Sequence, residues 1–239
     1  MLKFKAEQFK IIKLIIILIF ITLIIIDFDR FMHILYFKND IRKIKVIDLF
    51  NKDMCDRIIK EGEEYASING WTTRRHDNYP TTDNLITHKW KIRDEIDSII
   101  KPKIRKELSE MYNIDGDSIN LKEMFLVKYD INGQKDLEYH TDGSNFSFVI
   151  SLNEDYTGGG TNFKYNNKTI KLKTGECLLF NGFNEHSGIK IESGTRYILT
   201  GFLSYNKYTY YDNYARRILS SNYLNIIILI LLTGIVIYI

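Results

Sequence analysis

The sequence predicts a mainly β domain of the sandwich or jelly-roll type, with helices packed on one side and an apolar segment at each end. From Met124 onward, short stretches alternate apolar and polar residues and are separated by glycine-containing turns. Before them, two stretches have the apolar spacing of amphipathic helices. Runs of isoleucine and leucine lie outside both groups. Many short strands after a helical start are typical of two packed sheets with helices added.

Length and composition indicate one globular domain with appendages. The chain has 239 residues, of which 45% are hydrophobic and 26% are charged, as in globular proteins. A net charge of +3 is too small to indicate nucleic-acid binding, and no basic stripe is present, so we expect no nucleic-acid partner. The two cysteines, Cys55 and Cys177, are too few for a disulfide framework and are expected to be buried thiols.

The two apolar ends are interpreted as membrane anchors. Residues 11–26 and 224–239 are each almost entirely apolar, and their length is close to the lower limit of about 17 residues for a spanning helix. No small-residue cleavage site follows the first run, which argues against a removed signal peptide. Core strands are the alternative interpretation. The expected domains are an anchor at 1–30, a catalytic domain at 31–221 and a C-terminal apolar segment at 222–239. Basic residues flank both runs, so the side of the membrane is left open.

Two amphipathic helices are expected before the strands. The first covers Met54–Ala66 and the second covers Lys91–Tyr112. Pro102 lies inside the second segment and has no backbone N–H to donate, so we expect a kink or a split there. The expected strands are MFLVKY, FSFVISL, TNFKY, TIKLK, ECLLF and RYILTGFL.

A candidate metal site begins with the motif His140-Thr141-Asp142. Residues two apart in a strand point to the same face, so an imidazole and a carboxylate would lie together. His186, just after ECLLF, is a candidate third ligand. Two histidines and one carboxylate suit non-haem Fe(II), and zinc hydrolases can use similar ligands. For the motif alone, an exposed or hydrogen-bonded polar pair is the alternative.

Arg196 suggests an anionic ligand. It starts the strand RYILTGFL, where alternation would place Arg196, Ile198, Thr200 and Phe202 on one face. If that face is the inner one, an unpaired arginine would be costly unless an anion meets it. A dicarboxylate would supply that anion, because a guanidinium binds a carboxylate through two parallel hydrogen bonds. The alternative is an arginine that points into solvent.

The combination of H-x-D, His186 and Arg196 resembles the iron and 2-oxoglutarate-dependent dioxygenases of the prolyl 4-hydroxylase and procollagen-lysine hydroxylase branch. The stretch FLVKYDINGQKDLEYHTDGSNFSFVISLN is similar to the family's tyrosine strand and metal motif. DYTGGGTNF resembles its glycine-rich turn, SGTRYILTGFL its arginine strand, and DNYPTTD a segment that precedes the lysyl hydroxylase core. The resemblance covers roughly residues 71–205, with the metal-binding core at about 120–205.

The resemblance implies a double-stranded β-helix fold and a set of functional residues. His140, Asp142 and His186 would bind Fe(II), while Arg196 and Tyr129 would hold the distal carboxylate of 2-oxoglutarate. O2 would be the second cosubstrate, and L-ascorbate would keep the iron reduced. The segment after ECLLF departs from the family's subgroups, which leaves the substrate open.

The expected function is hydroxylation of a prolyl or lysyl side chain of a protein, with release of succinate and CO2. A dioxygenase that acts on a small molecule and an inactive membrane-anchored binding module are the alternatives. A zinc hydrolase is disfavoured because it would give Arg196 no task. The resemblance suggests the lumen of the endoplasmic reticulum, with a viral or other membrane left open. Oligomeric state is not indicated.

Overall fold

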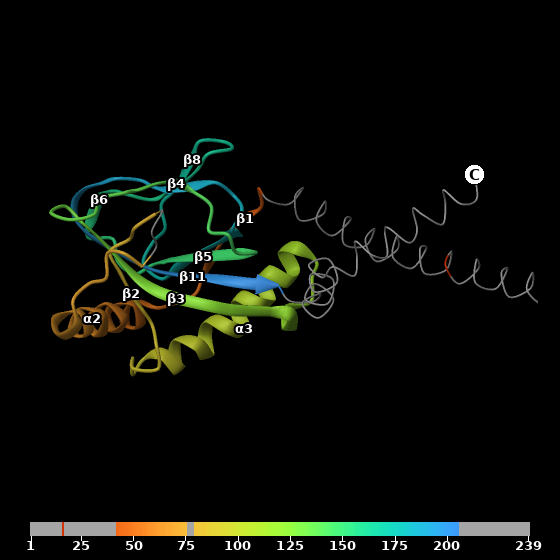
Figure 1. The fold of residues 1–239 in the computed structure, drawn as a ribbon, viewed down its shortest axis with the longest axis horizontal. Helices are drawn as coiled ribbons and strands as arrows, with labels where there is room; N and C mark the ends of the chain where they lie inside the picture. Colours follow the sequence, from red (N-terminus) through yellow and green to blue (C-terminus); the bar gives the residue numbers. More distant parts are fainter. Residues whose placement is uncertain (1–15, 17–41, 76–78, 206–239) are drawn as a thin grey trace, which may run out of the picture.

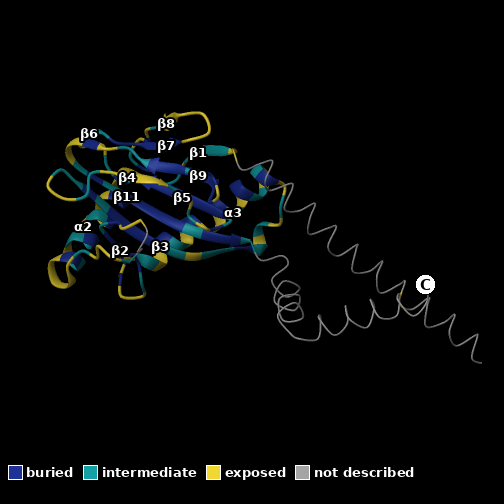
Figure 2. Ribbon diagram, turned by 45° about the horizontal axis from the view of Figure 1, so that its top comes forward, coloured by how far each residue is buried: buried dark blue, intermediate teal, exposed yellow. Residues whose placement is uncertain are grey.

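Two β-sheets lie face to face, and two helices cover the outer face of the larger sheet (Figure 1). The computed structural model describes residue 16 and residues 42–75 and 79–205. Figure 2 shows that the central strands are mostly buried, while exposed residues gather in the loops and on the outer helix faces. The layers are therefore helices, larger sheet and smaller sheet.

The helices are α2 (Lys52–Asn69), α3 (Arg93–Tyr112) and the short 3-10 helix η1 (Gly116–Ser118). The strands are β1 (Ile44–Asp48), β2 (Asp83–Leu85), β3 (Ile119–Asp130), β4 (Leu137–His140), β5 (Phe146–Ser151), β6 (Tyr156–Gly158), β7 (Thr161–Phe163), β8 (Lys168–Ile170), β9 (Glu176–Asn181), β10 (His186–Gly188) and β11 (Ile191–Tyr205). The larger sheet has the order β1-β9-β5-β11-β3-β2, with β6 also paired to β11, and the smaller sheet has the order β4-β10-β7-β8. The strand pairs with known register are antiparallel.

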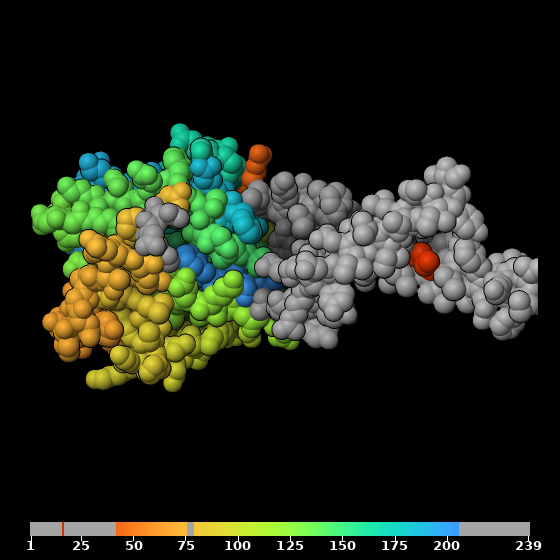
Figure 3. Space-filling model, in the orientation of Figure 1, coloured from red at the N-terminus to blue at the C-terminus, as the bar shows by residue number. Residues whose placement is uncertain are grey.

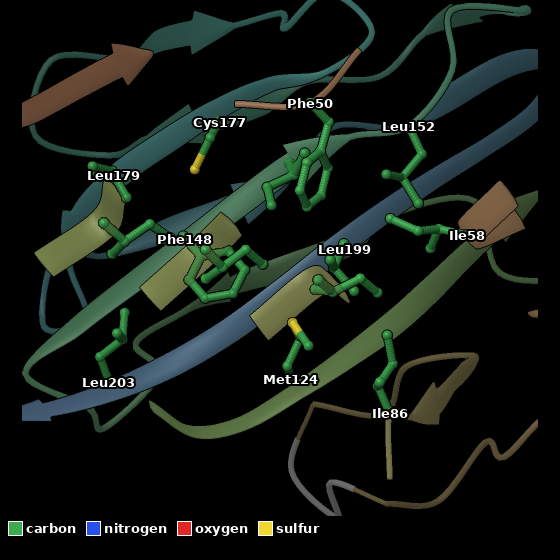
Figure 4. Packing of buried hydrophobic residues seen from close by; sticks show 14 of the residues in the cluster. Phe50, Ile58, Ile86, Met124, Phe148, Leu152, Cys177, Leu179, Leu199 and Leu203 are labelled. Atoms are coloured by element: carbon green, nitrogen blue, oxygen red, sulfur yellow. The ribbon is translucent and has the colours of Figure 1, made fainter. Parts of the chain in front are cut away.

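One hydrophobic core lies between the helices and the larger sheet. Figure 4 shows how its side chains meet, with Phe148 of β5 between Leu179 of β9 and Leu199 of β11, and Ile58 of α2 beside Leu152. The N-terminus of α2 is capped by Asn51, whose side chain accepts a hydrogen bond of 2.9 Å from the backbone N–H of Met54. This core fixes the larger sheet as a rigid support for the face on its other side.

A second core lies between the two sheets, and strand alternation separates it from the first. On β3, Phe125, Val127 and Tyr129 belong to the inter-sheet core, whereas Met124 and Leu126 belong to the helix side. The central strands are buried on both faces, which explains why their sequences read as nearly continuous apolar runs. Side chains on the inner face of β3 and β11 therefore point toward the smaller sheet.

Of the two outcomes expected at Pro102, a kink or a split, the split is wrong. Helix α3 runs without interruption from Arg93 to Tyr112 with Pro102 inside it. Pro102 and Ser98, whose carbonyl loses its helical partner, are both exposed, so water can replace the missing hydrogen bond. Ile100 and Ile104 on the opposite face are fully buried and hold the helix on the sheet.

The last strand is longer than the sequence predicted. RYILTGFL was expected to begin after a turn, but β11 starts at Ile191 and continues through that stretch. The turn is instead an irregularity in the pairing with β6, between Ile191 and Ser193, and Gly194 adopts a positive φ of 76°. A bulge bends the strand here without ending it.

The remaining fold predictions have clear outcomes. A mainly β fold with two helices on one side is confirmed, and Figure 3 shows the helices in orange and yellow along one edge of the molecule. Cys55 and Cys177 are free and buried, as expected. The expected anchors lie outside the described residues, apart from Ile16. Among the described residues, no helix combines the length and the apolar character needed to cross a bilayer.

Candidate active site

The smaller sheet brings the two predicted histidine ligands together. His140 is the last residue of β4 and His186 is the first residue of β10, and the two are direct partners in the antiparallel register. Their rings lie 4.4 Å apart between centroids. They belong to distant parts of the chain, so only the strand pairing makes them neighbours.

Asp142 completes a three-residue cluster. Its Oδ1 lies 3.3 Å from Nε2 of His140 and 3.7 Å from Nε2 of His186. One ligand atom of each residue lies within 4.8 Å of the other two. The reason for this differs from the prediction, because Asp142 follows the end of β4 and is not part of an extended strand.

Backbone hydrogen bonds orient all three groups. Nδ1 of His140 lies 2.8 Å from the carbonyl oxygen of Glu138, and Nδ1 of His186 lies 2.8 Å from the carbonyl oxygen of Asn184. A carbonyl can only accept, so each Nδ1 carries a proton, and each ring in its neutral form turns an Nε2 lone pair toward the cluster. The backbone N–H of Asp142 donates to the carbonyl oxygen of Gly182 at 2.8 Å. Such outer bonds fix the orientation of metal-binding imidazoles.

Burial and mutual charge set the protonation of the cluster. Burial opposes charge on Asp142, but the hydrogen bond from His140 and the charge of His186 hold the pKa of its carboxyl below the usual value. Burial lowers the pKa of His186. Burial also acts to lower the pKa of His140, but the hydrogen bond with Asp142, the contact with the Glu138 carbonyl and the charge of Asp142 together raise that pKa above its usual value. The cluster therefore offers an ionised carboxylate and, at His186, a readily available neutral imidazole.

Arg196 lies on the inner face of β11 and is only 3% exposed. Among the described residues no carboxylate lies within ion-pair distance of it, and its buried Nε has no hydrogen-bond partner. Its guanidinium carbon lies 5.3 Å from the ring centre of Tyr129 and 6.0 Å from that of Tyr156. Aromatic faces alone do not offset the burial of a cation, so this side chain is suited to meet an anion.

Tyr129 stands directly opposite Arg196 in the register of β3 and β11. Its side chain is buried, and burial raises the pKa of its phenol, so the hydroxyl keeps its proton and can donate a hydrogen bond. A Cβ added to Gly188 would lie 3.0 Å from this hydroxyl, so glycine at that position leaves space in front of it. Arg196 and Tyr129 together form a donor pair at one end of the inner face.

A cavity of about 750 Å³, including its open mouth, contains all five predicted site residues. Three register pairs of β3 and β11 line it, namely Tyr129 with Arg196, Val127 with Ile198, and Phe125 with Thr200. His140, Asp142 and His186 line the same cavity from the smaller sheet. The predicted alternation of Arg196, Ile198, Thr200 and Phe202 on one face is also observed, because all four contribute to the wall.

The cavity fits Fe(II) and a 2-oxo dicarboxylate. Two imidazoles and one carboxylate form the donor set of the non-haem iron triad, which leaves other coordination positions open. The buried Nε of Arg196 has no hydrogen-bond partner among the described residues, so it can donate to the carboxylate at the far end of such a ligand. Aliphatic side chains such as Val127 and Ile198 line the cavity beside the donor pair and make this part of its wall apolar.

Three site residues were not predicted from the sequence. Gly182 accepts the backbone hydrogen bond of Asp142, and a Cβ there would lie 2.4 Å from oxygen atoms of Ser144. Gly188 leaves room for Tyr129, and Tyr79 places its ring centre 5.1 Å from that of His140. The glycines inside NGFNEHSG were an available signal of close backbone approach. Tyr79 lies inside DNYPTTD, whose resemblance to a family segment was a signal for this region but not for a contact with the distant His140.

Comparison with known proteins gives consistent results. No family model matches the chain. Human procollagen-lysine,2-oxoglutarate 5-dioxygenase 2 is 30% identical over 175 residues, which are 65% of this chain and 22% of that protein. The chain is a member of the 2-oxoglutarate/Fe(II) oxygenases. It is related to the procollagen lysyl hydroxylases and the prolyl 4-hydroxylases, as the sequence motifs suggested, and it spans about a fifth of the length of the curated relative.

Solved structures of this family share the fold. A viral collagen prolyl hydroxylase from Paramecium bursaria Chlorella virus-1, solved with 2-oxoglutarate, has a TM-score of 0.53 and 18% identity, covering 67% of this chain and 94% of that one. A prolyl hydroxylase from Trichoplax adhaerens, in complex with a hypoxia inducible factor peptide, has a TM-score of 0.56 and 15% identity, and the match covers 74% of this chain and 87% of that one. These similarities show the jelly-roll fold of the 2-oxoglutarate/Fe(II) oxygenases.

Proposed function

We propose that this oxygenase uses Fe(II), 2-oxoglutarate and O2 to hydroxylate a prolyl or lysyl side chain of a protein. The observation that carries the proposal is the buried Arg196, without an anionic partner among the described residues, in the same cavity as the three-ligand cluster. A cluster alone would suit several metals, but this pair of features calls for a metal and a carboxylate ligand together.

Each residue has a defined task in this proposal. His140 and His186 would present their Nε2 lone pairs, and Asp142 its carboxylate, to Fe(II). Arg196 and Tyr129 would bind the distal carboxylate of 2-oxoglutarate and so orient its 2-oxo acid end toward the cluster. When bound, iron with 2-oxoglutarate and O2 supplies the oxidant for a C–H bond, and 2-oxoglutarate leaves as succinate and CO2.

The protein also excludes water from the site. The side chains of Asp142 and His186 are only 5% and 7% exposed, and that of His140 is 10% exposed. Val127, Ile198 and the other apolar wall residues surround the space beside them. A dry cavity strengthens the charge interactions of Arg196 and protects reactive species from side reactions. We include L-ascorbate as the reductant that restores Fe(II) after turnover without substrate.

A peptide substrate is supported by the relatives and by the shape of the site. The human relative is named as a procollagen-lysine dioxygenase, and the Trichoplax structure contains a peptide. In this chain the cavity is partly open to solvent, so a side chain on an extended peptide could enter it. The expected apolar anchors would tether the domain to a membrane, and we propose the lumen of the endoplasmic reticulum as its location, with a viral membrane as the alternative.

The test is succinate formation by the full chain in detergent with Fe(II), ascorbate, O2 and either prolyl or lysyl peptides. Iron-dependent succinate that increases with one peptide class, and hydroxylated peptide detected by mass spectrometry, is the expected result. His140→Ala should abolish both, whereas His88→Ala, which changes an exposed histidine outside the cavity, should not. Succinate without any peptide product in every peptide tested would favour a small-molecule substrate. Absence of succinate from a folded chain would favour a binding module.

A further inference from the structure

A groove adjoins the active-site cavity and shares part of its wall. Its sides are formed by residues 79–82 and 136–138, together with Thr73 and Gln134, and it encloses about 910 Å³ including open solvent. Tyr79, Thr81 and Leu137 line both the groove and the cavity. The two spaces are therefore neighbours across these three side chains, and Tyr79 is the largest of them.

Tyr79 stands at the boundary with its ring against a proposed iron ligand. Its ring centre is 5.1 Å from that of His140, with the planes 34° apart. The side chain is 39% exposed, which is unusual for a large aromatic residue next to a buried cluster. Because the residue is partly exposed, part of its ring and its polar hydroxyl can meet a ligand.

The backbone that carries Tyr79 is held in place. Tyr79 precedes Pro80, which restricts it to extended conformations. Gln134 then bridges the segment, because its Nε2 donates to the carbonyl oxygen of Pro80 at 3.0 Å and its Oε1 accepts from the backbone N–H of Thr82 at 2.6 Å. The hydroxyl of Thr81 also donates to the fully buried carboxylate of Asp83. The ring is presented from a fixed support, as a binding surface requires.

We propose that Tyr79 is a substrate-binding residue over which the peptide passes from the groove into the cavity. This rests on the proposed function. An extended peptide in the groove would place its target side chain beside His140, with the residues next to the target against the exposed face of Tyr79. Tyr79 lies in the segment DNYPTTD, whose resemblance to a family segment assigns no role to this tyrosine. The observation that assigns a role to Tyr79 is its position where the groove meets the cavity.

The test compares Tyr79→Ala and Tyr79→Phe with the native full chain. Peptide KM and kcat are measured from succinate, and peptide binding is measured separately by fluorescence anisotropy without O2. The peptides carry lysine beside the target, because Asp136 and Glu138 of the groove would repel an acidic peptide. Tyr165→Ala is the matched control, since Tyr165 is 38% exposed but lines neither space.

Tyr79→Ala is expected to raise the peptide KM and dissociation constant about tenfold, with a smaller change in kcat, because a well-placed aromatic contact contributes about that much. Tyr79→Phe keeps the ring and should stay within about twofold of the native chain. The Fe(II) dissociation constant is measured as well. A loss of iron affinity that accounts for the whole effect would mean that Tyr79 acts only through His140, and would overturn the proposal.

The two proposals fail in different ways. Peptide binding that weakens in Tyr79→Ala, in a chain without iron-dependent succinate, supports the role of Tyr79 and contradicts the proposed function. Succinate formation with an unchanged peptide KM and dissociation constant in Tyr79→Ala leaves the function standing and overturns the role of Tyr79. A chain that binds no peptide at all contradicts this role directly.

Discussion

Replacing Arg196 by methionine should stabilise the ligand-free protein and remove its response to 2-oxoglutarate. The side chain is 3% exposed, and no anion among the described residues offsets its charge. The effective penalty for such an ion is several kcal/mol. If methionine recovers about 2 kcal/mol of it, the melting temperature should rise by about 4–8 °C for a domain of this size.

The effect on the cosubstrate has the opposite sign. Two charge-assisted hydrogen bonds from a guanidinium to a carboxylate contribute about 1.5–3 kcal/mol each, so Arg196→Met should weaken 2-oxoglutarate binding roughly 10²- to 10⁴-fold. In the native chain, 2-oxoglutarate at about 100 times its dissociation constant should add about 2.7 kcal/mol to the free energy of unfolding. The variant should gain almost nothing from the same concentration.

Thermal unfolding under anaerobic conditions, with Fe(II) and with or without 2-oxoglutarate, measures both effects. Lys122→Met is the control, because it removes the same charge from an exposed position on β3. The reasoning is refuted if Arg196→Met is less stable than the native chain without ligand and gains as much as the native chain from 2-oxoglutarate. That result would mean that the arginine is satisfied within the fold.

Two further predictions concern the support of the site and the stability of the fold. Gly182→Ala places a Cβ 2.4 Å from oxygen atoms of Ser144, so it should destabilise the protein by about 1–3 kcal/mol and weaken Fe(II) binding. Chemical denaturation measures the first effect and metal titration the second. Gly133→Ala is the control and should show neither effect, because no atom lies nearer than 3.9 Å to its added Cβ. The hydrogen bond from Lys45 lowers the pKa of the Glu107 carboxyl in the folded protein. This ion pair therefore stabilises the protein fully above the unfolded-state pKa of 4.5, and the stabilisation is lost as the pH falls through the lower folded-state pKa. The stability difference between the native chain and Glu107→Gln should accordingly shrink below pH 4.5, and a difference that grows on acidification would contradict this assignment.

The sequence predicted those parts of the site that depend on local periodicity. Alternation along a strand is fixed by backbone geometry, so the shared face of Arg196, Ile198 and Thr200 could be predicted without knowing the partners of that strand. The apolar spacing of amphipathic helices likewise predicted the two helices before the strands. Cys55 and Cys177 were expected to be buried thiols because two cysteines in a predicted helix and a predicted core strand are too few for a disulfide framework, and burial raises the pKa of Cys55 to about 11.

Features that depend on contacts between distant segments could not be predicted. Asp142 is aimed by a hydrogen bond to Gly182, 40 positions away in a different loop, and not by strand alternation. The contact of Tyr79 with His140 joins two segments that are far apart in the sequence and that both line the cavity. Pro102 was expected to split a helix because propensity considers only the local backbone, whereas buried isoleucines on the other face keep α3 intact.

The most direct test of the account is an anaerobic titration of the full chain with Fe(II) and 2-oxoglutarate, followed by visible absorption. A 2-oxo acid that chelates Fe(II) gives a charge-transfer band, which neither component shows alone. The account predicts that this band appears in the native chain and in His88→Ala, is absent in His140→Ala, and needs far more 2-oxoglutarate in Arg196→Met. A native chain without the band, or a His140→Ala variant that gives it at the same concentrations, would contradict the assignment of this cavity as the iron and 2-oxoglutarate site.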